Sequence, residues 1–402
     1  MGGRSVPRTV KKSNAEVPRQ ADCKEKMSST SSLANLACRV EEWIEDLSLS
    51  CPPSGVSDAD FNDVALELFR RQSESNPALA QLLRFWRVES SALTAWNEIP
   101  CVPTAAFKEM DMTTLEAGDR TRVFFSSGTT QQERGRHFHH AQSIALYERS
   151  LKQWLRQHCW PAGGREAMTC VSLTPPPSCV PHSSLVHMIE VGAGTASPSE
   201  LRFCGELGPD DGWRLNEGLL RSQIEAAVEK EGPVCLFGTA FNFVQLLDTL
   251  SAWGETWSLP GKSRIMETGG YKGRTRELRK TELYEQMEDR LGIEREWMIS
   301  EYGMSELSSQ AYDGVVGSAD PDLDQRVFHF PEWVRVRVVS PETLEEVGVG
   351  ETGLLQVFDL ANIWSALAIQ TEDLAVRCPQ GFSLKGRASF AEPKGCSLLP
   401  EA

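Results

Sequence analysis

The sequence predicts an α/β protein with a helical N-terminal part, a mainly parallel sheet and a small β-rich subdomain. Apolar residues recur at helical spacing from Leu33 to Trp96. Between Pro100 and Val316, short apolar runs alternate with helical stretches, as in a sheet whose strands are linked by helices. Beyond Val316, apolar runs follow one another without long helices, which indicates a β-rich unit.

Composition indicates an ordinary soluble chain with an acidic surface. The net charge is −15 over 402 residues, which argues against nucleic acid as the main partner because phosphate binding needs clustered Lys and Arg. No apolar run approaches the roughly 20 residues that span a bilayer, so we expect no transmembrane segment and no secretory signal. The 11 cysteines form no C-x-x-C pair, which is typical of reduced thiols in a cytoplasmic protein.

The first hundred residues divide into a polar leader and a helical part. Residues 1–30 offer little to bury, so we expect them to be disordered. Residues 31–100 are expected to form the helical N-terminal segment of the catalytic domain. Leu36, Val40 and Ile44 share one helical face, and Asp58 is expected to cap a second helix.

Residues 101–315 are expected to form the α/β nucleotide-binding core. The helices of this core are predicted over 142–155 and 241–250. Its strands are predicted at 123–125, 168–173, 234–237, 263–267 and 297–300. Residues 316–390 are expected to be the β-rich subdomain, with strands at 334–338, 354–358, 367–369 and 382–384.

A Ser/Thr/Gly turn after the strand at 123–125 is the first candidate site. It reads Ser126-Ser127-Gly128-Thr129-Thr130 and is followed by Arg134. Hydroxyls, backbone N–H groups and a glycine suit phosphate oxygens, and an arginine can bind them with two hydrogen bonds. The turn is not a Walker A loop, because G-x-x-x-x-G-K-[ST] is absent.

Two further motifs supply nucleotide-binding chemistry. The first, Tyr302-Gly303-Met304-Ser305-Glu306, carries a ring that can cover a purine and a carboxylate, Glu306, that can hold Mg²⁺. The second is Thr371-Glu372-Asp373, followed by Arg387, in which an acidic residue can accept hydrogen bonds from ribose hydroxyls. Taken singly, each of these motifs is also compatible with an ordinary loop.

Together and in this order, the three motifs resemble those of the acyl-adenylate-forming superfamily. The resemblance implies that Ser126 to Thr130 and Arg134 hold the phosphates of ATP. It implies that Tyr302 to Glu306 meet adenine, the α-phosphate and Mg²⁺, and that Asp373 meets the ribose with Arg387 after it. A Gly pair such as Gly269-Gly270 lies along the adenine in that superfamily. Gln131 and Glu133 depart from the usual Gly and Pro, and Glu133 brings negative charge beside the phosphates.

A narrower resemblance covers nearly the whole chain after the leader. The segments 100–108, 267–274 and 394–398 look like those of LuxE-type acyl-protein synthetases. That family implies a long-chain fatty acid substrate, a cysteine near the C-terminus that carries the acyl group as a thioester, and a fatty-acyl reductase as partner. Cys396, in the tail 391–402 expected to be flexible, is the matching cysteine and a candidate catalytic residue together with Arg134 and Glu306.

The position of Arg387 leaves no room for the mobile lid domain that many superfamily members carry. Only 402 − 387 = 15 residues follow it. We therefore expect the lid to be absent, with the α-phosphate charge met by residues already named or by a partner.

Three histidines follow the phosphate turn. His137, His139 and His140 invite a metal interpretation, but no acidic or Cys ligands lie at a confirming spacing. A role at a helix start, or one His facing the substrate carboxylate, is favoured instead.

The sequence therefore predicts an ATP- and Mg²⁺-dependent ligase that forms an acyl-adenylate and passes the acyl group to Cys396. Two alternatives remain open. One is transfer to coenzyme A, as in phenylacetate-CoA ligases. The other is a nucleotide-binding or partner-binding chain with a degenerate site, favoured by Gln131, Glu133 and the expected absence of the lid.

Overall fold

The structure is a computed structural model that describes residues 32–49, 55–126, 134–161, 168–195, 200–209, 212–270 and 278–388. The predicted leader and the tail with Cys396 lie outside these residues. Within the described ranges, no helix is long and apolar enough to cross a membrane.

A six-stranded sheet forms the centre of the α/β part, in the order β11-β10-β9-β8-β4-β5. Neighbours from β5 to β10 are parallel, and β11 is antiparallel to β10. The strands are β4 (Thr169–Ser172), β5 (Glu200–Phe203), β8 (Val234–Thr239), β9 (Arg264–Thr268), β10 (Met298–Tyr302) and β11 (Ala311–Tyr312). Every residue of β8, β9 and β10 is buried, as expected for a parallel sheet covered on both faces. The predicted α/β class is confirmed.

Alternate residues of these strands pack against different helices. Leu236 of β8 belongs to an apolar core with α8, α9 and α10, whereas its neighbour Phe237 belongs to a core with α6 and α7. Successive side chains of a strand point to opposite faces, so the two helix groups cover the two faces of the sheet. The helices are α6 (Ala141–Cys159), α7 (Ser184–Ala193), α8 (Glu217–Glu229), α9 (Ala240–Trp253) and α10 (Lys280–Leu291).

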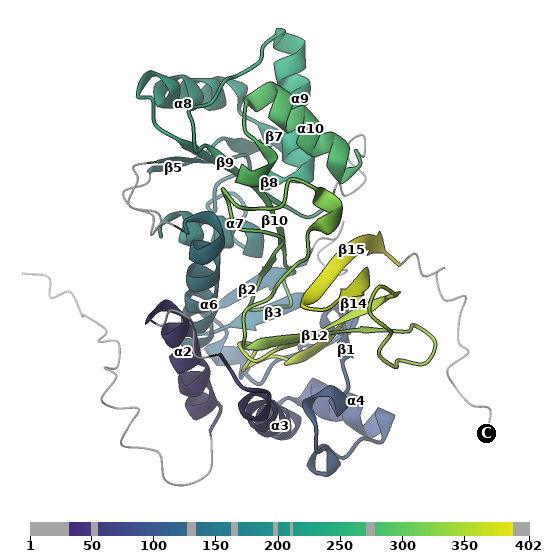
Figure 1. Cartoon of the computed structure of the whole chain (residues 1–402). Helices are drawn as coiled ribbons and strands as arrows, with labels where there is room; N and C mark the ends of the chain where they lie inside the picture. The colour runs from purple at the N-terminus through teal and green to yellow at the C-terminus, as the bar shows by residue number, and fades with distance from the viewer. Residues whose placement is uncertain are drawn as a thin grey trace, which may run out of the picture.

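A second sheet holds the strands of the C-terminal part. It contains β12 (Val334–Val339), β13 (Thr352–Asp359), β14 (Ala368–Cys378), β15 (Gly381–Arg387) and one early strand, β1 (Val102–Pro103). The helices α2 (Leu33–Leu49), α3 (Asp58–Ser75) and α4 (Pro77–Trp86) share an apolar core with this sheet. Figure 1 shows α3 and α4 beside this sheet in the lower part of the molecule, with α8, α9 and α10 in the upper part.

One sequence expectation at a helix start is wrong by one residue. Ser57, not Asp58, caps α3, because the Ser57 backbone is extended and its hydroxyl accepts a hydrogen bond from the Asp60 N–H at 3.1 Å. Asp58 is the first helical residue, where its charge complements the positive end of the helix.

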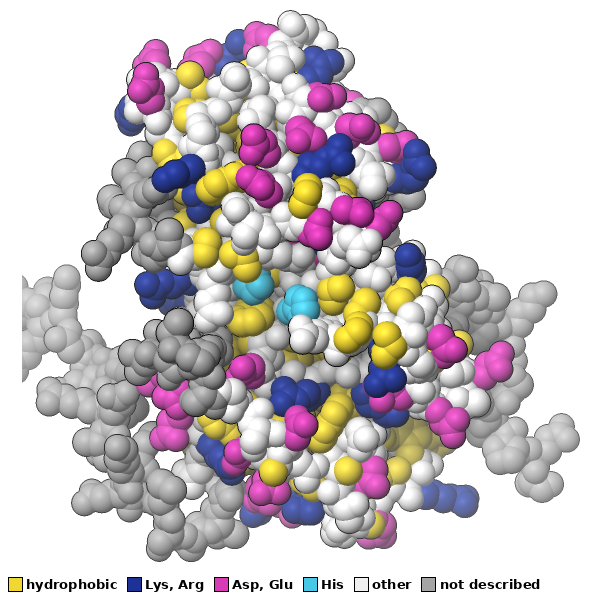
Figure 2. Space-filling model, in the orientation of Figure 1, with side chains coloured by type: hydrophobic (Ala, Val, Ile, Leu, Met, Phe, Trp, Pro, Cys, Tyr) yellow, Lys and Arg dark blue, Asp and Glu magenta, His cyan; other side chains and the backbone are white. Residues whose placement is uncertain are grey.

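The remaining elements are short. They are α5 (Ala106–Glu109), β2 (Arg122–Phe125), β3 (Arg136–His139), β6 (Gly205–Leu207), β7 (Trp213–Leu215) and the 3-10 turns Ser90–Ala92, Trp96–Glu98, Ala117–Asp119, Arg295–Trp297 and Leu323–Gln325. β2 and β3 form an antiparallel hairpin outside both large sheets. On the face drawn in Figure 2, acidic and basic side chains are interspersed, with many acidic ones over the upper part.

Candidate active site

The phosphate turn is closed at its base by the β2–β3 hairpin. The Ser126 N–H donates to the Gly135 carbonyl at 3.0 Å, and the Gly135 N–H donates to Ser126 Oγ at 2.7 Å. These two hydrogen bonds join Ser126 and Gly135, on either side of residues 127–133, and so fix the two ends of the predicted loop. We call this pair of residues the neck of the loop. Ser127, Gly128, Thr129 and Thr130 lie outside the described residues. Arg134 is half-buried and lies directly before Gly135.

Glu306 lies against this neck. A Cβ atom placed on Gly135 would come within 2.8 Å of Glu306 Oε1 and 3.0 Å of Ser126 Oγ. The structure thus brings the first and second motifs together, although 180 residues separate Ser126 from Glu306 (306 − 126). This close approach also explains why residue 135 is a glycine, because a larger side chain there would displace either the Glu306 carboxylate or the Ser126 hydroxyl.

The Glu306 carboxylate has the chemistry of a magnesium ligand. It is 5% exposed, and Ser305 Oγ donates to its Oε2 at 2.9 Å. Burial raises the pKa of Glu306, while Ser305 and the more distant charges of Arg387 and Lys108 act in the opposite direction. No cluster of three or more His, Cys, Asp or Glu that could hold a metal occurs in the described part of the chain. One carboxylate and nearby hydroxyls fit Mg²⁺, which is commonly held by one or two carboxylates together with substrate phosphates.

The second and third motifs meet at Asp373. Tyr302 Oη donates to Asp373 Oδ2 at 2.8 Å, and Arg387 Nε lies 3.4 Å from Asp373 Oδ1. Asp373 and Arg387 are paired across β14 and β15, so the sheet itself sets their separation. The side-chain oxygens of Asp373 therefore lie between an aromatic hydroxyl and a guanidinium group, beside the edge of the Tyr302 ring.

Three aromatic side chains hold the Tyr302 ring. Phe328, Phe330 and Phe382 lie with ring centroids 6.1, 6.1 and 5.3 Å from it, all at steep angles. Edge-to-face packing of this kind fixes the ring orientation. The ring is 7% exposed, so in this conformation it is packed more deeply than an open purine platform would be.

Gly269 and Gly270 follow β9, beside the start of the Tyr302 motif. Thr268 is paired with Glu301 across β9 and β10, which places both glycines next to Tyr302 and Gly303. A Cβ on either would meet nothing within 4 Å, so a flat ligand can approach this backbone. Gly303 is different: a Cβ there would collide with Glu301 Oε1.

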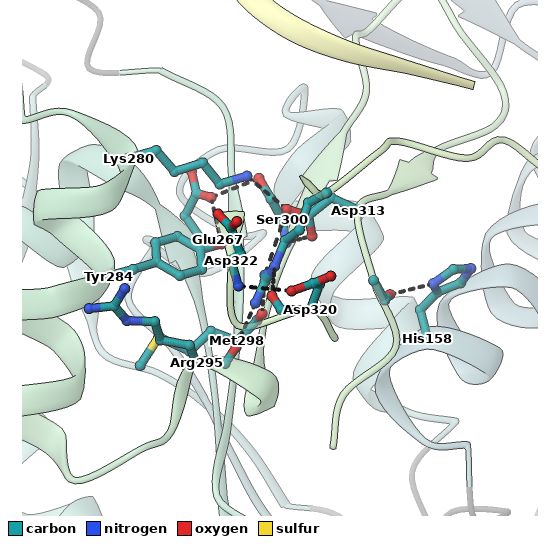
Figure 3. A network of polar contacts seen from close by, with 12 residues as sticks. His158, Glu267, Lys280, Tyr284, Arg295, Met298, Ser300, Asp313, Asp320 and Asp322 are labelled. Carbon is teal, nitrogen blue, oxygen red and sulfur yellow. Dashed lines mark hydrogen bonds and ion pairs between the residues drawn. The ribbon is translucent and has the colours of Figure 1, made fainter. Parts of the chain in front are cut away.

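A buried polar network behind the two strands was not predicted from the sequence. Asp313 accepts from the Ser300 N–H at 2.6 Å and from Lys280 Nζ at 2.7 Å, and Ser300 Oγ donates to Glu267 Oε2 at 2.8 Å (Figure 3). Arg326 donates to three backbone carbonyls nearby. The network ties the ends of β9 and β10 to the start of α10 and so steadies the strands that carry the glycine pair and Tyr302.

The three histidines after the phosphate turn have different structural roles. His140 caps α6, with its Nδ1 accepting from the Ser143 N–H at 3.2 Å, which confirms the predicted role at a helix start. His137 Nδ1 lies 2.8 Å from the Ser305 carbonyl and links the hairpin to the Glu306 motif. Burial lowers the pKa of His137 to about 4, so the ring is neutral and Nδ1 donates. The two ring nitrogens of His139 have no hydrogen-bond partner within the described part of the chain.

The family model described as "Acyl-protein synthetase, LuxE" matches residues 216–399. The LuxE match includes Gly269, Tyr302, Glu306, Asp373 and the tail cysteine, whereas the phosphate turn precedes it. None of the curated protein sequences compared matches the chain.

Solved structures of adenylate-forming ligases share the fold of this chain. 2-Hydroxyisobutyryl-CoA ligase in complex with 2-HIB-AMP and CoA in the thioesterification state aligns with a TM-score of 0.60 and 13% identity, covering 83% of this chain and 69% of the ligase. An open conformation of the same ligase aligns with a TM-score of 0.59 and 12% identity, covering 83% and 71%. The predicted fold of adenylate-forming enzymes is confirmed.

Proposed function

We propose that this protein activates a long-chain fatty acid with MgATP and transfers the acyl group to the thiol of Cys396, for delivery to an acyl reductase. The observation that carries the first step is the convergence of Ser126, Glu306, Tyr302 and Asp373. The family match and the adenylate-forming fold support activation of an acid by adenylation.

In the first step, a carboxylate oxygen of the acid attacks the α-phosphorus of ATP, and pyrophosphate leaves. Ser126 to Thr130 and Arg134 bind the phosphates, and Asp373 accepts hydrogen bonds from the ribose. Glu306, helped by the Ser126 hydroxyl, would hold Mg²⁺, which neutralises the phosphate charge. The chain's contribution is positioning and charge stabilisation rather than covalent chemistry.

In the second step, the Cys396 sulfur attacks the carbonyl carbon of the mixed anhydride and loses its proton, and AMP leaves. The chain length permits this. The described chain ends at Ala388, whose N–H donates to the Glu372 carbonyl at 2.9 Å, next to Asp373. Cys396 follows eight residues later, a reach of at most about 28 Å at roughly 3.5 Å per residue. That span is long enough for the thiol to return to an adenylate beside Asp373.

The test is the mass of the intact protein after incubation with MgATP and fatty acids of several chain lengths, for wild type and Cys396→Ala. We expect a hydroxylamine-labile acyl adduct on wild type alone, with AMP released in equal amount. Cys378→Ala is the matched control, because it removes a thiol from β14 and should keep the adduct.

Other outcomes would redirect the proposal. If neither protein gains mass but AMP appears when CoA is added, the acceptor is CoA and the protein is an acyl-CoA ligase. If no acid yields AMP or exchanges pyrophosphate into ATP, the chain binds nucleotide or a partner without catalysis.

A further inference from the structure

Several deeply buried polar atoms behind the Tyr302 motif have no hydrogen-bond partner among the residues that the structure describes. They are Nδ1 and Nε2 of His139, Oε1 of Gln310 and Oη of Tyr312. These residues are 1%, 4% and 0% exposed. An unpaired buried polar atom destabilises the folded state, so several of them in one place indicate that a bound group pairs with them.

Tyr312 and Gln310 lie beside Glu301, and His139 lies near them on the far side of the Tyr147 ring. Tyr312 is paired with Glu301 across β10 and β11. Gln310 Cγ and Glu301 Oε1 both lie against the position that a Cβ on Gly303 would take. Burial raises the pKa of both Tyr312 and Tyr147, and the negative charge of Glu301 adds to this effect on each, so Glu301 lies near both rings. The His139 ring lies 5.9 Å from Tyr147, centroid to centroid. We name His139, Glu301, Gln310 and Tyr312 the polar cluster.

Glu301 accepts a hydrogen bond from Thr268 Oγ1, and no ion pair to it occurs among the described residues. Burial raises the pKa of Glu301 to about 7 and lowers the pKa of His139, which is therefore neutral. An anionic group would be repelled by Glu301, and an apolar chain would leave the polar atoms unpaired.

The hydrogen-bond donors and acceptors of the polar cluster indicate which chemical group of a ligand would pair with them. Gln310 Oε1 only accepts, whereas a neutral His139 and the Tyr312 hydroxyl can each donate and accept. A hydroxyl group also donates and accepts, so one hydroxyl can pair with two or three members of the cluster.

The polar cluster adjoins the place where the acid reacts. Glu301 directly precedes Tyr302, and its carboxylate lies under Gly303. The His139 and His137 rings have centroids 4.3 Å apart, and His137 contacts the Ser305 carbonyl beside Glu306. The side chains of Glu301 and Tyr302 point to opposite faces of β10. Tyr302 faces Asp373, so the polar cluster lies on the other face, toward α6.

We propose that the polar cluster binds a hydroxyl group on the substrate acid, close to its carboxyl end. The inference rests on the proposed adenylation and narrows its substrate class to hydroxylated acids. The hydroxyl donates to Glu301 or Gln310 and accepts from Tyr312 or His139.

The experiment is acid-dependent pyrophosphate exchange into ATP, with straight-chain acids and their 2-hydroxy and 3-hydroxy analogues at several chain lengths. We expect kcat/KM for the best hydroxy acid to exceed that of its unsubstituted analogue by about 100-fold or more, because a site built for a hydroxyl rejects the analogue that lacks it. Tyr312→Phe should reduce this ratio about tenfold. The variant should fold normally, because it removes a hydroxyl that has no hydrogen-bond partner among the described residues.

Tyr284→Phe is the matched control, because its hydroxyl belongs to the Glu267 network and should not affect the ratio. Equal kcat/KM for hydroxylated and unsubstituted acids would overturn the inference and leave the proposed function intact. A preference for amino analogues would also overturn it, in favour of an ammonium group at Glu301. If the ratio of kcat/KM values for hydroxylated and unsubstituted acids stayed unchanged in both Tyr312→Phe and His139→Phe, the polar cluster would not bind the hydroxyl group, and the inference would be overturned. If none of the acids supported exchange of pyrophosphate into ATP, the result would count against the proposed function itself.

Discussion

Replacing Glu301 by Gln should make the protein more stable, and increasingly so as pH rises. Glu301 is 5% exposed, and burial raises its pKa from 4.5 to about 7. A carboxyl group whose pKa is higher in the folded state than in the unfolded state binds more protons when folded. The free energy of unfolding therefore falls as pH rises, from the unfolded pKa through the folded one.

The size of the effect follows from these two values. The rise of the Glu301 pKa from 4.5 to about 7 corresponds to a penalty of about 3 kcal/mol once the pH is well above 7. At pH 5.5 the penalty is only about 1.4 kcal/mol, because the folded group is still protonated. The variant keeps an acceptor for the Thr268 hydroxyl and carries no charge. Its advantage over wild type should therefore grow by about 2 kcal/mol between pH 5.5 and pH 8.

The assay is urea unfolding of wild type and Glu301→Gln across this pH range. Glu342→Gln, an exposed carboxyl group on the loop after β12, is the matched control and should show no such growth. A constant difference between wild type and Glu301→Gln at all pH values would refute the account of Glu301 as a buried group without a compensating cation.

Three further predictions concern the site and its frame. Gly135→Ala should lower pyrophosphate exchange about 100-fold, because the new methyl group would displace Glu306, whereas Gly118→Ala, with open space around it, should leave exchange unchanged. Tyr302→Phe should raise KM for ATP about tenfold through loss of its bond to Asp373, with kcat less affected; an unchanged KM would remove Tyr302 from the nucleotide site. His140→Ala should lower the free energy of unfolding by about 1 kcal/mol through loss of the α6 cap, measurable by urea unfolding, and equal stability would contradict that role.

The sequence predicted where helices and strands lie along the chain better than it predicted which strands pair with one another. Val234 to Phe237 is a continuous apolar run that predicts a strand, and the structure buries every residue of it, as is usual for parallel strands covered on both faces. β3 was missed, since Arg136-His137-Phe138-His139 shows polar residues where a buried strand usually has apolar ones. The pairing of β1 with β14 joins residues about 270 positions apart, and no local pattern carries that information.

The residues of the candidate site that belong to sequence motifs could be predicted. Tyr302, Glu306, Asp373 and Arg387 were identified from residue type and order, and the structure brings them together. Their supporting groups were not identified, because Asp313 and Lys280 have no distinctive spacing in the sequence. Glu301 was overlooked for a related reason: a carboxylate beside a motif looks exposed in sequence, and only the fold shows that it is buried.

The most direct test of the central claim is exchange of labelled pyrophosphate into ATP, for wild type, Glu306→Gln and Glu372→Gln. Adenylation predicts exchange that requires both an acid and Mg²⁺. It also predicts that Glu306→Gln loses at least about 100-fold of this activity, because a metal ligand at the phosphates is removed. Glu372→Gln, a half-buried carboxylate directly before Asp373, should retain exchange. Exchange that proceeds equally well in Glu306→Gln, or that needs no acid, would contradict the proposed chemistry.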